Sequence, residues 1–501
     1  MSNIPTATYR LQFHQGFTFA HARAIVPYLA RLGISHVYAS PIFRAAPGST
    51  HGYDVCVHNE LNPELGSREE FEAFSAEMKT HGLGLIVDFV PNHMGIEKAL
   101  NPWWRDVLEN GSASSYAAFF DVDWLPVKRE LENKVLLPVL GDQYGRVQEG
   151  DGFRVEFAEG DFRLAYGDFT LPLAPRTTLP FLRRAAELLA SVPAELESIV
   201  MEKTCTRERL ARLCELPGEW SCAARRWQTM NRNHRRDIEG ESAPDANEEY
   251  LLYQTLLGAW PLEGLNDENR ASFIARIQDY MVKALHEAKV NSSWVEPNAA
   301  WDEAVREFIA AIPAPGPRNR FPQRLALLAE WVAQLGAINS LTQTVLKLTC
   351  PGVPDFYQGS ELWDFSLVDP DNRRPIDYEL RRQRLGETMN AEPGELLGIW
   401  RDGRIKLFAT HRLLALRREH PQLFAEGEYH PIAVEGAFAD SVVAFTREHE
   451  GTAILVVISR HLAGGAFPPV GEVWTGTQTV PSERKRGWRD VFTGRICEGD
   501  Q

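Results

Sequence analysis

One short segment of the chain combines side-chain types that hold polar ligands by directed hydrogen bonds. Asp88 lies near the carboxyl end of the near-continuous apolar run Leu83–Val90, and Asn92 and His93 come shortly after this run. Active-site residues of (β/α)₈ enzymes gather at that end of the parallel strands. The alternative is a capped strand–helix loop with a hydrogen-bonded Asp88 and a structural His93. The segment by itself favours neither interpretation.

Two further segments carry candidate ligand contacts. His51-Gly52-Tyr53-Asp54 follows the second predicted strand, and the aromatic face of Tyr53 is suited to stacking against a pyranose ring. Pro351–Glu361 has the form of a turn after a last strand, and Asn372 and Arg373 come shortly after it. Pocket-lining contacts and a structural ion pair are both open interpretations for Asn372, Arg373 and their neighbour Asp371.

The elements that position these residues alternate between strand and helix in the first hundred residues. Apolar runs mark the strands, helical spacing marks the segments between them, and Gly33 and Gly82 end the helices. Such βα repeats are typical of a barrel or a doubly wound sheet. The predicted elements are strands at Thr8–Phe13, Ser35–Pro41 and Leu83–Val90, and helices at Phe19–Leu32 and Glu69–Thr80.

The rest of the chain changes character several times. Short alternating runs predict a β-rich insertion, and two helical regions follow, from about 180 to 214 and from 219 to 312. A strand is predicted at Val345–Thr349, and alternating strands with turns return after residue 393. The predicted organisation is 1–100 as the N-terminal part of a barrel, 101–180 as the insertion, 181–312 as helical, 313–393 as the C-terminal part of the barrel and 394–501 as an antiparallel β domain.

Composition excludes some classes of partner. A net charge of −15 argues against nucleic acid and against an anionic membrane, since both attract clustered Lys and Arg. We expect no membrane-spanning stretch and no signal peptide, and therefore a cytoplasmic protein. The 6 cysteines lack metal-site spacing, so we expect neither a zinc site nor a disulfide framework. The sequence does not indicate the oligomeric state.

Longer motifs resemble one family. Asp88–His93 and Gly352–Glu361, in this order, resemble the first and last conserved regions of the α-amylase family of glycoside hydrolases. Within that family, the match is to maltooligosyltrehalose synthases. It is carried by the segments Thr8–Phe13, Ala39–Phe43, His51–Asp54, Phe119–Trp124, Asn247–Thr255 and Glu361–Pro375.

The resemblance implies a fold and an activity. The fold would be α/β, a (β/α)₈ TIM-type barrel with β-rich and helical insertions and a C-terminal antiparallel β domain. The activity would be an isomerisation that turns the terminal α-1,4 bond of a maltooligosaccharide into an α,α-1,1 bond, with no cofactor. Tyr53, His93 and Asp88 would contact the sugar, and Asn372 and Arg373 would line the pocket. We expect no calcium, because the single amide of Asn92 does not form an oxygen cage.

The segment that should carry the catalysis is missing. The family places its nucleophile in Gly-x-Arg-x-Asp-x-x-x-His and a third carboxylate in Thr-His-Asp, and neither motif occurs here. The one formal match to the acid/base motif, Glu202-Lys203, has the spacing of a surface helix, so we assign no catalytic residue. The junction is expected near Cys214–Leu216, and the barrel is expected to be incomplete. A non-catalytic glucan-binding protein and an α-glucan hydrolase remain as alternatives.

Overall fold

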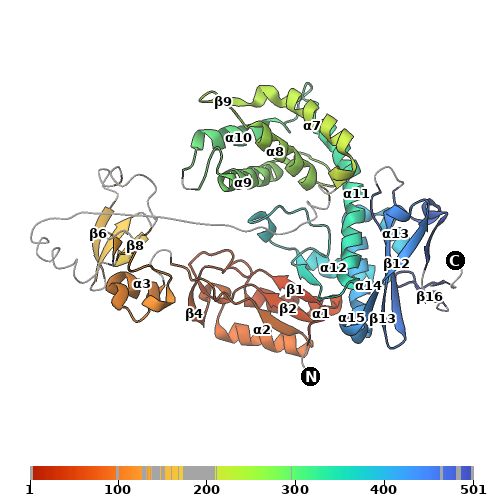
Figure 1. Cartoon of the computed structure of the whole chain (residues 1–501), viewed down its shortest axis with the longest axis horizontal. Helices are drawn as coiled ribbons and strands as arrows, with labels where there is room; N and C mark the ends of the chain where they lie inside the picture. The colour runs from red at the N-terminus through yellow and green to blue at the C-terminus, as the bar shows by residue number, and fades with distance from the viewer. Residues whose placement is uncertain are drawn as a thin grey trace, which may run out of the picture.

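The computed structural model describes most of the chain, and the longest gap is 173–208. The described residues are 4–96, 101–126, 153–158, 161–166, 169–172, 212–294, 296–462, 467–480 and 487–497, with 131–132, 134–135, 137, 147 and 209 between them. The predicted helix at about 180–214, including Glu202, lies almost entirely outside these residues. Figure 1 shows a parallel sheet, a group of helices above it, and a second sheet beyond a long helix.

A parallel sheet of four strands is the centre of the N-terminal half. Its order is β11-β1-β2-β5, and the register pairs Thr8 with both His36 and Asp355. A closed TIM-type barrel has eight parallel strands, and the sheet formed by the described residues contains four. The strands are β1 (Thr8–Leu11), β2 (His36–Ala39), β5 (Gly84–Val87) and β11 (Asp355–Tyr357).

Helices α1 (Phe19–Leu32) and α2 (Arg68–Thr80) follow β1 and β2 and confirm the predicted βα repeats. Gly33 ends α1 with a φ of 110°, and a Cβ at this position would lie 2.8 Å from the Cβ of Leu414. Only glycine suits both constraints. Ser67 and Glu70 form a capping box at the start of α2. Between the two helices, β3 (Phe43–Ala45) and β4 (Val55–Leu61) form an antiparallel hairpin, and η1 (Pro63–Leu65) precedes α2.

One predicted strand is wrong. Val345–Thr349 is the last part of helix α11 (Phe321–Thr349), and the barrel strand that follows is β11, Asp355–Tyr357. A short apolar run with β-branched residues does not distinguish a strand from a buried helix. Here the helical periodicity of the preceding residues continues through the run, and the helix ends only before Pro351.

The insertion contains the predicted β structure. Strands β6 (Phe153–Ala158), β7 (Asp161–Tyr166) and β8 (Phe169–Pro172) form an antiparallel sheet in that order. Helix α3 (Pro102–Asn110) precedes them and is capped by Asn101, whose side chain accepts from the backbone N–H groups of Trp103 and Trp104. Two short 3₁₀ turns, η3 (Gly111–Ala113) and η4 (Ala117–Phe119), follow α3.

The second predicted helical region is confirmed. It is built around one core to which each of the four long helices contributes, including Trp227, Leu256, Ile277 and Phe308. The helices are α7 (Pro217–Asn231), α8 (Ala246–Ala259), α9 (Arg270–Ala288) and α10 (Ala299–Ala311). Short elements complete the region: η6 (Arg212–Glu215), η7 (Arg232–His234), β9 (Arg236–Ile238) and β10 (Glu241–Ala243).

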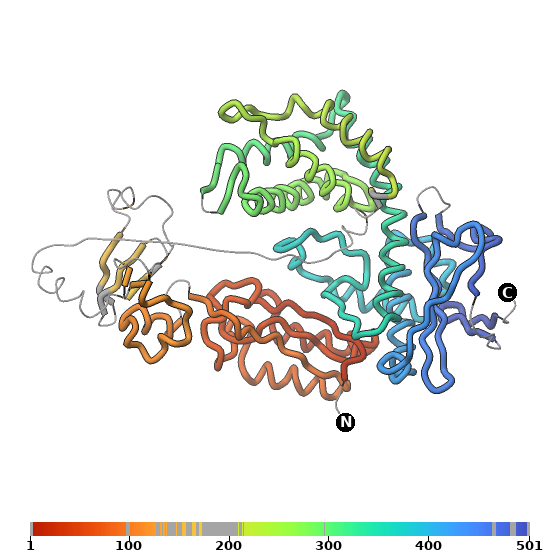
Figure 2. Tube along the Cα trace, in the orientation of Figure 1, coloured from red at the N-terminus to blue at the C-terminus, as the bar shows by residue number. Residues whose placement is uncertain are grey.

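Helix α11 connects the parts of the molecule, as the tube in Figure 2 shows. Its residues enter different cores in turn: Leu325 joins the helical region, Ala337 packs with Trp400, and Leu348 reaches the parallel sheet. By length and composition this helix passes as a membrane span, so the expectation that no stretch reaches that length is wrong. However, 50% of its most apolar window is buried inside the protein, as in a core helix.

The C-terminal part ends in antiparallel sheets, as predicted, but helices precede them. The larger sheet has the order β14-β13-β12-β15 and packs Phe445 and Val456 against the end of α11. The helices are α12 (Tyr378–Thr388), α13 (Pro393–Gly398), α14 (Arg404–Glu419) and α15 (Pro421–Glu426). The strands are β12 (Glu428–Gly436), β13 (Val442–His449), β14 (Thr452–Ser459), β15 (Thr477–Val480), β16 (Trp488–Arg489) and β17 (Ile496–Cys497).

Candidate functional site

Strand alternation gives the parallel sheet two different faces. Tyr9 on β1 is paired in register with Val37 on β2 and with Phe356 on β11. All three side chains are fully buried against the helices. The neighbouring positions Arg10 and Tyr38 therefore point to the opposite face, which is the inner face of the barrel. Both remain partly exposed, because strands that would close the barrel over them are not present among the described residues.

A tyrosine–carboxylate contact lies at the carboxyl end of this inner face. The Tyr53 hydroxyl donates a hydrogen bond of 2.8 Å to Oδ2 of Asp88. Burial, followed by the hydrogen bond and the charge of Asp88, raises the pKa of Tyr53. Burial and the same carboxylate also raise the pKa of Tyr38. Burial and the charge of Asp88 thus both favour the protonated form of the two tyrosines.

His93 joins this group through the backbone of Tyr53. Its Nε2 lies 3.1 Å from the Tyr53 carbonyl oxygen, so Nε2 carries the proton in this contact. The ring is exposed, and Nδ1 lies 3.5 Å from the amide nitrogen of Asn92. Nδ1 therefore acts as an acceptor, and in this structure its donor is the Asn92 amide. The structure therefore brings Tyr53, Asp88 and His93, three of the predicted contact residues, together.

The loop that carries Tyr53 is held in place by a hydrogen bond from Gln12, the residue after β1, and by a hydrogen bond within the loop. Gln12 donates from its amide nitrogen to the His51 carbonyl oxygen at 2.9 Å, and Ser49 Oγ donates to Asp54 at 2.5 Å. Gly52 has a φ of 77°, and a Cβ at this position would lie 2.9 Å from the Pro41 carbonyl oxygen. This glycine lets the loop turn back tightly over the end of the second strand.

Arg10 and Asp355 lie on the same inner face of the parallel sheet. Neither was among the site residues predicted from the sequence. Arg10 lies 3.1 Å from Asp355 and stacks over the Tyr38 ring, 4.2 Å from its centroid. Thr8 also donates to Asp355, at 2.6 Å. Strand alternation from Thr8 and His36 was the available signal for Arg10 and Tyr38. It was not usable for Asp355, because the last strand was predicted several residues too early.

Arg373 and Asn372, the two remaining predicted contact residues, differ in whether they reach the loop that carries Tyr53. Arg373 donates to Thr50 Oγ1 at 3.1 Å and pairs with Asp369, so it reaches the loop that carries Tyr53. Asn372 is 9% exposed, and its Oδ1 has no hydrogen-bond partner among the described residues. Within that part of the chain, Asn372 is not hydrogen-bonded to Tyr53, Asp88 or His93. The structure thus places Arg373 beside the loop and gives no direct link for Asn372.

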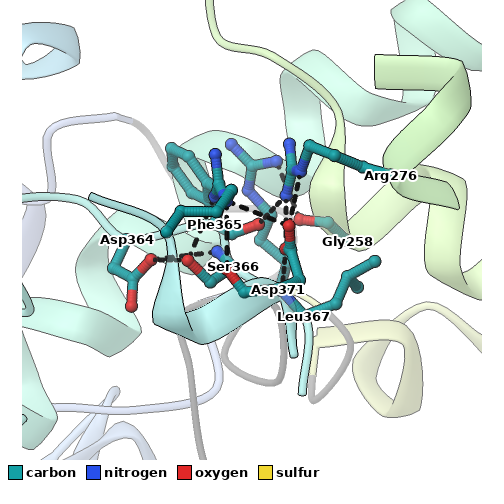
Figure 3. A network of polar contacts seen from close by, with 9 residues as sticks. Gly258, Arg276, Asp364, Phe365, Ser366, Leu367 and Asp371 are labelled. Atoms are coloured by element: carbon teal, nitrogen blue, oxygen red, sulfur yellow. Dashed lines mark hydrogen bonds and ion pairs between the residues drawn. The ribbon is translucent and has the colours of Figure 1, made fainter. Parts of the chain in front are cut away.

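Asp371 takes a structural role. Figure 3 shows it beside Arg276 from α9, whose nitrogens lie 2.9 and 2.8 Å from its oxygens, and the Arg374 guanidinium lies 2.9 Å away. It also accepts from the Leu367 backbone N–H at 2.7 Å. Burial alone raises the pKa of the Asp371 carboxyl, but the hydrogen bonds and charges of Arg276 and its other donors outweigh this effect and lower it. The ion-pair interpretation of Asp371 is confirmed.

Glu361, which ends the last-strand motif, also serves the fold. It is fully buried and accepts hydrogen bonds from Tyr9 at 3.1 Å and Tyr28 at 2.9 Å, while Arg381 lies 2.9 Å away. This cluster lies on the helix-covered side of the sheet, opposite to Asp88. Glu361 is therefore not available to a ligand at the inner face.

Carboxylate chemistry at the site is limited. Retaining glycoside transfer needs a nucleophile and an acid/base carboxylate roughly 5 Å apart. On this face of the sheet, Asp88 lies at the carboxyl end of β5 and Asp355 at the amino end of β11, and both are engaged by Tyr53, Arg10 or Thr8. No group of three or more His, Cys, Asp or Glu side chains suited to a metal ion occurs among the described residues. This arrangement binds and orients polar groups but provides no free acid/base pair.

Comparison with known proteins gives matches to part of the chain. The family described as alpha amylase, catalytic domain, matches residues 24–166. A cyclomaltodextrinase of Geobacillus thermopakistaniensis is 38% identical over 103 residues, which is 21% of this chain and 17% of that protein. Residues 24–166 are thus similar to part of the α-amylase catalytic domain, which accounts for the βα repeats of this region.

Full-length similarity is to a narrower group. A putative maltooligosyl trehalose synthase of Mycobacterium tuberculosis is 25% identical over 773 aligned positions, covering 98% of this chain and 96% of that protein. The structure of an Arthrobacter ramosus maltooligosyltrehalose synthase shares the fold, with 22% identity, a TM-score of 0.72 and coverage of 99% and 98%. Another maltooligosyl trehalose synthase structure has a TM-score of 0.77 at 20% identity, with the same coverage. The chain is a relative of the maltooligosyl trehalose synthases, as its motifs predicted.

The alignment length bears on the missing segment. It spans 773 positions, whereas the chain has 501 residues, so more than 270 aligned positions have no residue in this chain. Because the alignment still covers nearly all of both proteins, the unmatched positions fall within the aligned span.

Proposed function

We propose that this chain is a glucosylmutase-type protein that binds the reducing end of maltooligosaccharides, and that its own rearrangement activity is weak or absent. The observation that carries the proposal is the Tyr53–Asp88–His93 group at the carboxyl ends of the strands. It offers an aromatic ring, a carboxylate and an imidazole to one sugar. The relatives named as maltooligosyl trehalose synthases support this substrate class.

The isomerisation that the resemblance implies requires catalytic carboxylates as well as substrate binding. A glucosyl unit is transferred to a carboxylate, and the anomeric hydroxyl of the released glucose then attacks it to form the α,α-1,1 bond. Catalytic carboxylates act as a unit, so losing them removes most of the rate. Neither the nucleophile motif nor the third-carboxylate motif is present in the sequence. The retained residues therefore support recognition more than turnover.

A non-catalytic glucan-binding protein is the second candidate. It is favoured by the engagement of Asp88 and Asp355 with Tyr53, Arg10 and Thr8, which leaves neither carboxylate free to act as nucleophile or acid. Hydrolysis is less favoured, because it requires the same missing carboxylates.

Incubation with maltopentaose distinguishes the candidates. We expect measurable binding by calorimetry with little or no change in reducing ends. Loss of reducing ends without free glucose would instead indicate isomerisation at a normal rate, and a gain would indicate hydrolysis. Either result would contradict the proposed loss of activity, and absence of binding would contradict the proposed site.

Tyr53→Phe tests the site directly. The variant keeps the ring and removes the hydroxyl that donates to Asp88, so Asp88 loses a partner and orients the sugar less well. We expect the dissociation constant for maltopentaose to rise about tenfold, which corresponds to ~1.4 kcal/mol. Tyr429→Phe is the matched control, because Tyr429 is 44% exposed on β12 in the C-terminal sheet. Equal affinity in Tyr53→Phe and the control would remove Tyr53 from the site.

A further inference from the structure

Strand β5 is an open edge of the parallel sheet. It pairs with β2 on one side, and no described strand pairs with its other side. The N–H groups of Gly84 and Asp88 donate to Ser35 and Ala39, so the even-numbered residues of β5 face β2. The backbone N–H and C=O groups of Leu85 and Val87 therefore point away from the sheet and have no backbone partner among the described residues.

The side chains on this edge are apolar and only half covered. Gly84, Leu85, Ile86 and Val87 are all intermediate in exposure, although the run was predicted to be a strand buried on both faces. No charge, proline or bulge lies within these residues to discourage pairing. Edge strands with these properties readily accept another strand.

The opposite edge of the sheet is different. On β11, Lys347 donates to the Asp355 carbonyl oxygen at 3.1 Å, and its ammonium lies 3.5 Å from the Phe356 ring centroid. The Tyr357 carbonyl oxygen accepts from Ser360 at 3.0 Å. A lysine and a tight turn thus occupy the acceptors that a strand beside β11 would use. Of the two edges, only β5 is available.

We infer that two copies of this chain pair through β5, antiparallel, about a twofold axis that passes beside Ile86. In this register Leu85 faces Val87 of the partner subunit, and each pair exchanges two backbone hydrogen bonds. The twofold makes the contact self-complementary, so every open group on the edge finds a partner in an identical copy. Ile86 faces Ile86 of the partner subunit on the inner face of the sheet. An uncharged edge suits an identical apolar strand better than a charged peptide, which would leave its charges unpaired.

The same register leaves the candidate sugar site open. Asp88 lies opposite Gly84 of the partner subunit, which has no side chain to cover the Tyr53–Asp88 contact. The inference does not depend on the proposed function, because an inactive chain without glucan affinity presents the same edge.

Sedimentation velocity of the full chain tests the pairing. We expect the mass to rise from 56.5 kDa toward twice that value as concentration increases over a roughly hundredfold range. Ile86→Glu should remain monomeric over this concentration range, because two carboxylates would face each other across the axis. Leu327→Glu is the control, because Leu327 is 71% exposed on α11, away from β5, and should leave association unchanged.

A charge-swap experiment tests the register itself. Ile86→Glu and Ile86→Lys should each be monomeric alone and should associate when mixed, because opposite charges would meet at the axis. Circular dichroism should show that both variants retain the fold. A wild-type chain that remains monomeric, a dimer that survives Ile86→Glu, or a mixture that fails to associate would overturn the inference. Equal weakening by Leu327→Glu would do the same.

Discussion

At the scale of single residues, the same side-chain types are divided between ligand contacts and fold contacts. Asp88 and Asp371 both lie in motifs near the ends of barrel strands. Asp88 faces the inner side with the tyrosines, whereas Asp371 is bound by Arg276 and Arg374. Sequence predicted the group around Asp88, because those residues follow strands directly. It did not decide between the two roles for Asp371, because Arg276 is 95 residues away in the chain.

Asp371→Asn should lower the free energy of unfolding by about 2–4 kcal/mol at neutral pH, because Arg276 would remain poorly exposed without a counter-charge. The folded-state pKa of Asp371 is lowered, so its contribution is present above the unfolded value of about 4 and is lost as pH falls below it. Urea unfolding at about pH 7 and about pH 3 should therefore show a deficit that shrinks in acid.

Arg68→Ala is the control for this prediction. It removes an ion pair with Glu72 whose side chains are 80% and 62% exposed, and it should change stability by less than about 0.5 kcal/mol. A deficit in Asp371→Asn that is no larger than that of the control would show that the network contributes little.

At the scale of elements, prediction succeeded where local signals were complete. Helix α1 begins at Phe19 and ends at Leu32 as predicted, because Gly33 supplies an unambiguous end. Val345–Thr349 failed, because its apolar residues fit a strand and the end of α11 equally well. The half-exposure of β5 was also missed. Its residues are those of a strand between two neighbours, and sequence alone does not show that one neighbour is absent.

Two helical glycines give a matched prediction. Gly336 lies within α11, where a Cβ would be 2.7 Å from Arg209 Cγ and 3.3 Å from Arg209 Cα. Gly386 lies within α12, where the nearest atom would be 3.7 Å away. Gly386→Ala should stabilise the protein by about 0.5–1 kcal/mol through helix propensity. Gly336→Ala should destabilise it, because the Arg209 backbone must move.

Thermal unfolding of the two variants provides the measurement. Shifts of opposite sign are expected. A rise in melting temperature for Gly336→Ala as large as that for Gly386→Ala would show that Arg209 does not press against α11.

At the scale of the whole molecule, buried arginines join the parts around the end of α11. Arg447, on β13, is 1% exposed and donates to the carbonyl oxygens of Thr349, Gly427, Leu423 and Phe424, at 3.0 to 3.2 Å. Arg417, on α14, donates to Thr6, Leu348 and Gly352, at 2.8 to 3.0 Å. Helix C-termini attract positive charge, so both contacts are favourable. Burial, and then the charge of Arg447, lowers the pKa of Arg417 to about 10.

Arg447→Met should separate the C-terminal sheet from the helices beneath it. Four carbonyl oxygens would lose their donor, and we expect a loss of about 3 kcal/mol. Limited proteolysis should cut within β13 and β14 faster than in the wild type. Arg447→Lys should rescue only part of the loss, because an ammonium cannot reproduce the planar fork. Arg460→Met, at an exposed arginine beside the same sheet, should cleave at the wild-type rate.

The position of β1 in the sheet has a consequence for synthesis on the ribosome. β1 lies between β2 and β11, and Thr8 pairs with Asp355 as well as with His36. While the chain is being translated, β1 and β2 can associate early, but the other side of β1 has no partner until residue 355 emerges. A nascent chain therefore carries an unfinished sheet through about two thirds of its synthesis, exposed to wrong partners during that time. Among the strands of this sheet, β1 would therefore need protection by ribosome-associated chaperones for the longest time.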